Sequence, residues 1–89
     1  AMELAPQDDE LRGVLQRFMK RMSKAFAIGL DSAKGRGEIP ENTDVEAAGD
    51  LLTSTMFGLA VLGRAGFPQE TLDGIIESTL GSLQRGARS

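Results

Sequence analysis

The chain lacks several residue types that carry protein chemistry. Its 89 residues contain no cysteine, no histidine, no tryptophan and no tyrosine. Without cysteine there is no disulfide or thiol chemistry, and without histidine the commonest metal ligand and general base is missing. The remaining polar residues show no nucleophile–base spacing, no metal motif and no phosphate-binding glycine loop. We therefore expect no enzyme, no metal site and no cofactor.

The chain also has fewer basic than acidic residues. The chain has 10 Lys and Arg residues against 13 Asp and Glu residues, a formal net charge of -3, whereas nucleic-acid-binding domains are usually basic. Four basic residues do share one side of a predicted helix: Arg17, Lys20, Arg21 and Lys24. They fit either a phosphate-contacting surface or the solvated back of an amphipathic helix. The second interpretation is favoured because the stripe lies opposite the apolar face, so we expect no direct DNA binding.

The longest segment without charge runs from Leu51 to Gly63 and reads LLTSTMFGLAVLG. As a helix it is apolar on every side, and such a helix is normally buried on every side. It is too short to span a bilayer, which needs ~20 apolar residues, so we expect no membrane contact. A chain of this size has few other elements to cover it. We therefore predict that a second copy of the chain covers its outer side.

The helix signals in the sequence predict three helices joined by short connections. Periodicity and glycine stop signals place them at residues 8–34, 44–64 and 68–85. Thr43 and Glu46 have the spacing of a capping box at the start of the second helix. No strand pattern is present. The predicted fold class is therefore all-α.

The first predicted helix carries a broad apolar stripe along one side, formed by Leu11, Leu15, Phe18, Met22, Ala25, Phe26, Gly29 and Ala33. Large, soft side chains are concentrated on it and on the second helix. Methionine adapts to irregular gaps and is common at promiscuous binding surfaces. These residues fit either an ordinary core or the wall of a ligand pocket.

Short connections imply that the three helices are antiparallel neighbours. The last two of them carry apolar surface that a second copy would cover. Gly58 lies in the middle of the apolar run, and a mid-helix glycine costs ~1 kcal/mol against alanine unless something requires it. It is the strongest candidate for a close helix crossing, although drift remains the alternative. The predicted dimer interface consists of Phe57, Gly58, Val61, Leu62, Ile75, Thr79 and Leu83.

The order of these features resembles a known family. One helix ends in AKGRGEI at residues 33–39, and DVEAA at residues 44–48 opens the next. That helix contains FGLAVL at residues 57–62 and leads through Gly66 and Phe67 to a last amphipathic helix. The pattern resembles the C-terminal half of TetR-family transcriptional regulators and covers nearly the whole chain.

The resemblance implies a function that the residues alone do not give. In that family an N-terminal helix-turn-helix binds the operator. The C-terminal part binds a small molecule and dimerises, commonly by packing its last two helices against the same pair of a partner. The resemblance therefore implies that the helices at residues 44–64 and 68–85 form a four-helix bundle across a homodimer. This chain would then be the dimerisation and effector-binding part of a repressor, with an apolar effector bound in the full-length parent. The ligand would contact Phe18, Met22, Phe26, Met56 and Leu59. The alternative is a stand-alone helical homodimerisation or interaction module without a ligand.

The same resemblance sets the expected domain organisation. Residues 1–2 read as a cloning scar, although a native start is the alternative, and residues 3–89 as a single helical domain. The DNA-binding domain would be absent from this chain. No charged and then apolar leader opens the sequence, and we expect a cytoplasmic protein.

Overall fold

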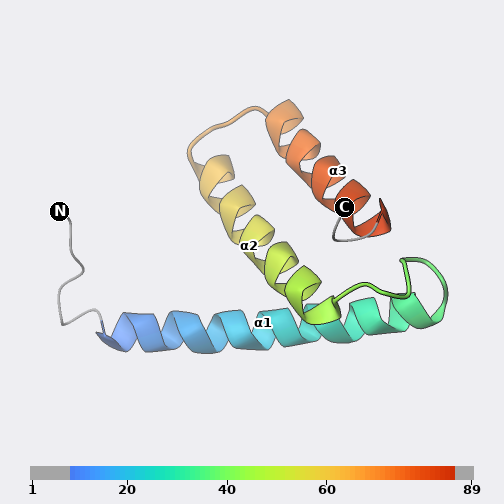
Figure 1. Ribbon diagram of the computed structural model, residues 1–89. Helices are drawn as coiled ribbons and strands as arrows, with labels where there is room; N and C mark the ends of the chain where they lie inside the picture. Colours follow the sequence, from blue (N-terminus) through green and yellow to red (C-terminus); the bar gives the residue numbers. More distant parts are fainter. Residues whose placement is uncertain (1–8, 86–89) are drawn as a thin grey trace.

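The computed structural model describes residues 9–85 and contains three helices in that range, α1 (Asp9–Gly35), α2 (Val45–Arg64) and α3 (Gln69–Arg85) (Figure 1). Every boundary lies within one residue of the predicted position, and the described residues form no strand. The all-α prediction is therefore confirmed. The predicted cloning scar at residues 1–2 lies outside the described residues.

Glycines end the first two helices in the way the sequence predicts. Gly37 and Gly66 have positive φ angles of 76° and 86°, a conformation that glycine adopts without a Cβ penalty. The amide of Glu38 donates to the carbonyl of Ala33, and the amide of Phe67 to that of Leu62. Both ends are Schellman motifs, which satisfy carbonyl groups that the helix leaves free.

The start of α2 differs from the prediction in one respect. The N-cap is Asp44, whose carboxylate accepts hydrogen bonds from the amides of Glu46 and Ala47 at 3.2 Å each. The predicted capping box on Thr43 is wrong because the Thr43 side chain is buried, 3% exposed, and does not reach the first turn. Its carbonyl instead accepts a hydrogen bond from Lys34 Nζ at 3.1 Å, which ties the connection back to α1.

Helices α2 and α3 form an antiparallel hairpin, and the longer α1 crosses one end of it. In Figure 1, α2 and α3 run antiparallel beside each other, and α1 lies across the foot of this pair. The backbones of α1 and α2 approach each other closely, as do those of α2 and α3, whereas within the described residues the backbones of α1 and α3 do not. The N-terminal half of α1 extends beyond the hairpin (Figure 1). One chain therefore covers each helix on only part of its surface.

Few side chains are buried in a single chain. The buried residues of α2 are Ala48, Gly49 and Thr53, all close to the crossing with α1. Elsewhere on α2, Leu51 is 41% and Val61 is 64% exposed. By length and composition alone, the 20 residues of α2 also suffice to cross a membrane, although the charge-free run is shorter. Of the 18-residue window that meets this test, 17% is buried.

Candidate functional site

At the crossing of α1 and α2 the two backbones come closer than at any other described glycine. A Cβ atom built at Gly49 would lie 2.6 Å from the carbonyl oxygen of Ser23 and 3.3 Å from the amide nitrogen of Ala27. The Ser23 hydroxyl donates to Thr53 Oγ1 at 3.1 Å, and Thr53 Oγ1 donates to the Gly49 carbonyl at 2.8 Å. Thr53 is fully buried. Small residues therefore let the two backbones approach and lock them with a short hydrogen-bond chain.

The predicted close crossing lies elsewhere on α2. Nothing approaches within 4 Å of a Cβ atom at Gly58, so no helix of the same chain crosses there. The sequence reasoning missed Gly49, although a signal was present: Gly49 and Thr53 are four residues apart, as are Ser23 and Ala27. Residues four apart share one face of a helix, so each pair presents a small, flat surface.

Three of the five predicted ligand residues come together. Phe26 of α1 and Met56 and Leu59 of α2 line one cleft, with side chains from α3 on its other side. Its volume is about 140 Å³, whereas pockets that bind drug-sized ligands measure ~300–1,000 Å³. The cleft is a partial pocket.

The other two predicted ligand residues lie further along α1. Phe18 packs edge-on against Phe57 of α2, with ring centroids 5.4 Å apart and planes at 65°. Both rings remain exposed, at 39% and 37%. Met22 is half-buried and does not line the cleft. Phe57, predicted at the dimer interface, therefore faces α1 of its own chain.

The remaining predicted interface residues differ in exposure. Val61 is exposed, and Leu62 and Ile75 are half-buried. Thr79 lines the small cleft, and its hydroxyl donates to the carbonyl of Ile75 at 2.8 Å. Leu83 is only 4% exposed, so its own chain already covers it.

A second and larger hollow lies between α1 and α2. This groove has a volume of about 1100 Å³ and an apolar floor formed by Leu15, Met19, Ala27 and Phe57. Its α1 side carries Arg12, Lys20 and Lys24, and its α2 side carries Glu46 and Asp50. We call it the α1/α2 groove. It shares no lining residue with the small cleft.

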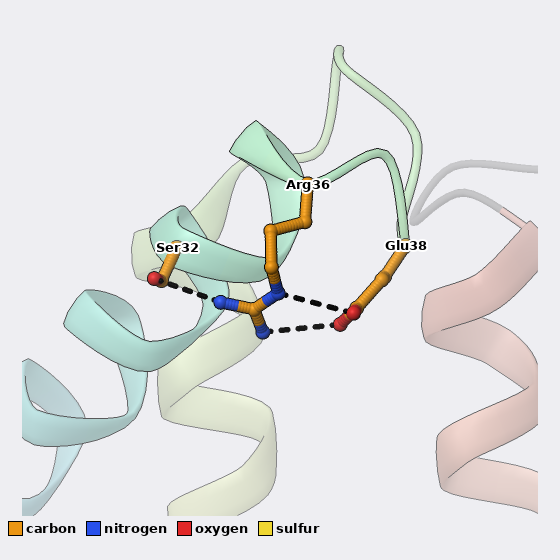
Figure 2. A network of polar contacts seen from close by, with 3 residues as sticks. All are labelled: Ser32, Arg36 and Glu38. Carbon is orange, nitrogen blue, oxygen red and sulfur yellow. Dashed lines mark hydrogen bonds and ion pairs between the residues drawn. The ribbon is translucent and has the colours of Figure 1, made fainter.

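A polar cluster fixes the end of α1. Arg36 donates two hydrogen bonds to the Glu38 carboxylate, at 3.0 and 3.1 Å, and a third to the Ser32 hydroxyl at 3.1 Å (Figure 2). The hydrogen bonds, followed by the opposite charges, raise the pKa of Arg36 and lower the pKa of Glu38. Both side chains are solvent-exposed. The cluster therefore links the last turn of α1 to the loop that follows it.

The described residues contain no group of three or more His, Cys, Asp or Glu side chains placed to hold a metal ion. The features that the geometry offers are an uncovered apolar surface, a small cleft and the α1/α2 groove. Each of them is suited to binding.

Comparison with known proteins adds evidence of a different kind. A family model described as "Tetracyclin repressor-like, C-terminal domain" matches residues 1–79. An uncharacterized HTH-type transcriptional regulator, YezE of Bacillus subtilis (strain 168), is 30% identical over 84 residues. The aligned region is 93% of this chain and 43% of that regulator, so the chain spans less than half of its relative's length. No solved structure matches.

Proposed function

This chain belongs to the tetracyclin repressor-like C-terminal domain family, and from that premise we propose that it forms the dimer and binds the effector of a transcriptional repressor. The family resemblance read from the sequence is thereby confirmed. The assignment to a cytoplasmic regulator without catalytic activity belongs to the same proposal. So does the expectation that operator binding is carried out by a part of the regulator other than these helices.

Dimerisation is supported by the apolar surface that one chain leaves uncovered on α2 and α3. On α2, Val61 is 64% and Leu51 is 41% exposed. On α3, Leu80 is 50% and Ile76 is 39% exposed, and both line the open side of the small cleft. Monomeric soluble proteins rarely expose large contiguous apolar patches, and extended ones mark interaction sites. The empty space around Gly58 on α2 leaves room for a helix of a second copy. The exposure of α2 is the observation that carries the proposal.

Effector binding is supported by the small cleft and by the apolar stripe of α1. Phe26, Met56 and Leu59 already converge, and Phe18 and Met22 continue the same helix toward its N-terminus. Ligand pockets are mostly apolar with a few polar groups, which suits these residues. A further wall is needed before the cleft reaches the size of a ligand pocket.

The limited size of the cleft favours a second candidate, a homodimerisation module without a ligand. The two candidates differ in what a structure of the full-length parent with its inducer would contain. An effector within one helix of Phe18, Met22 and Phe26 would support the first. An effector bound elsewhere, with this stripe filled by protein, would support the second.

Dimerisation is tested by introducing a charge on the proposed interface. Val61→Asp places a carboxylate on the uncovered face of α2, where it would be buried without a partner in a dimer. Ile28→Asp is the matched control, because Ile28 is 63% exposed on α1 and lies outside the predicted interface. Sedimentation equilibrium should show a dimer for the unsubstituted chain and for Ile28→Asp, and a monomer for Val61→Asp. Equal dimerisation of both variants would place the interface elsewhere.

A further inference from the structure

The α1/α2 groove is not used by the proposed function, and its two walls carry opposite charges. Arg12, Lys20 and Lys24 stand on the α1 wall, and Glu46 and Asp50 on the α2 wall. Within residues 9–85 the only ion pairs are Arg12–Asp9 and Arg36–Glu38. Lys20 and Lys24 therefore do not pair with Glu46 and Asp50, and these four side chains stay open to an occupant.

The shape of the groove indicates what kind of occupant fits. The two helices are held together at Ser23 and Gly49, and the N-terminal half of α1 extends past the hairpin (Figure 1). The floor of the groove between them is apolar, and its rims are exposed. At about 1100 Å³ and open to solvent, it is larger and less enclosed than a usual small-molecule pocket. An apolar floor between two open walls is the setting in which an amphipathic helix binds.

We propose that the α1/α2 groove binds an amphipathic α-helix whose apolar stripe is flanked by acidic residues on one side and basic residues on the other. The acidic flank lies along Lys20 and Lys24, and the basic flank lies along Glu46 and Asp50. The apolar stripe covers Leu15, Met19 and Phe57. A helix with one sign of charge on both flanks is attracted by one wall and repelled by the other. The two walls together therefore favour a helix with oppositely charged flanks.

Three fluorescein-labelled helical peptides of roughly 18 residues, about five turns, test the proposal. All share one alanine- and leucine-based apolar stripe; the first has glutamates on one flank and lysines on the other. The second has glutamates on both flanks and the third has lysines on both. A simple exchange of flanks is not a useful control, because a helix turned end to end restores the original match. Fluorescence anisotropy at low salt should show the mixed peptide binding about fivefold tighter than either of the others.

Reversing the charge of the α1 wall tests whether the walls determine which peptide binds. Lys20→Glu combined with Lys24→Glu makes both walls acidic, so the lysine-flanked peptide should become the tightest ligand. Arg17→Glu combined with Arg21→Glu is the matched control: it makes the same change of charge on the same helix outside the groove. It should leave the order of the three peptides unchanged, and circular dichroism should confirm equal helicity in all variants.

Several results would overturn the proposal. The proposal is wrong if no peptide binds, if all three peptides bind equally, or if the Arg17 and Arg21 variant shows the same reversal of preference. Release of monomers from the homodimer when the mixed peptide binds would show that a second copy fills the groove, and would also overturn it. The first three results do not bear on the interface at Val61, so the groove proposal can fail while the proposed function stands; release of monomers would instead place the dimer interface in the groove.

Discussion

The carbonyl oxygen of Ser23 on α1 lies 2.6 Å from the position that a Cβ atom would take at Gly49 on α2. Real Cβ atoms essentially never come so close to another atom, so only glycine fits without moving a helix. The crossing holds α1 to the α2–α3 hairpin, and both the small cleft and the α1/α2 groove depend on it for their shape.

Gly49→Ala should therefore destabilise the protein. Overpacking against a backbone atom costs ~1–3 kcal/mol, against which the better helix propensity of alanine returns at most ~1 kcal/mol. Gly29→Ala is the control, because Gly29 is mid-helix in α1 with nothing within 4 Å of its Cβ position, and it should be neutral or stabilising. Urea unfolding at one fixed protein concentration measures both. Equal stability of the two variants would contradict the close approach.

Thr53→Val should remove the hydrogen-bond chain while keeping the shape of the buried side chain. The Ser23 hydroxyl loses its acceptor and stays half-buried, with an expected loss of ~1–2 kcal/mol. Ser23→Ala removes the same bond from the other side. In a double-mutant cycle the combined variant should lose less than the sum of the two single losses. Additive losses would show that the two hydroxyls do not interact.

The Glu38 carboxyl should titrate below the ordinary range of glutamate. Its pKa is lowered by the hydrogen bond and the charge of Arg36. A lowered folded-state pKa contributes stability above the unfolded pKa and loses it as the pH falls through the folded value. The contribution is small because both groups are exposed. An NMR pH titration of the unsubstituted chain and of Arg36→Gln measures the pKa of Glu38. Its shift should disappear in the variant and shrink in high salt.

The element boundaries were predictable because local residues determine them. Positive φ at Gly37 and Gly66 ends two helices where the sequence placed glycine stop signals. The start of α2 was misassigned by one residue, because two neighbouring residues, Thr43 and Asp44, are both good caps and the sequence does not show which side chain is buried.

The face that α1 uses was less predictable. Periodicity found an apolar stripe, yet α2 crosses α1 at Ser23 and Ala27, and Leu11 and Leu15 on the stripe stay 56% and 47% exposed. The pattern shows which side of a helix is apolar but not what covers it. The closest approach was decided by small residues whose hydrophobicity signal is weak. Because the hydrophobic pattern gives small residues little weight, it missed Gly49, and it favoured Gly58 because Gly58 lies within the apolar run.

Gly58→Leu should weaken dimerisation without unfolding a single chain. Within one chain nothing lies within 4 Å of a Cβ atom at this position, so a larger side chain meets no neighbour there. At a close crossing with a second copy it would force the helices apart, at a cost of ~1–3 kcal/mol or more. Concentration-dependent sedimentation, with far-ultraviolet circular dichroism as the folding control, measures the effect. Unchanged dimerisation would place Gly58 away from the crossing.

A second copy should cover the apolar surface of α2 and α3, and sedimentation equilibrium of the unmodified chain at micromolar concentration measures whether it does. We expect twice the mass of one chain, because an interface that resembles a divided core holds two copies together at this concentration. A single species with the mass of one chain at these concentrations would contradict it.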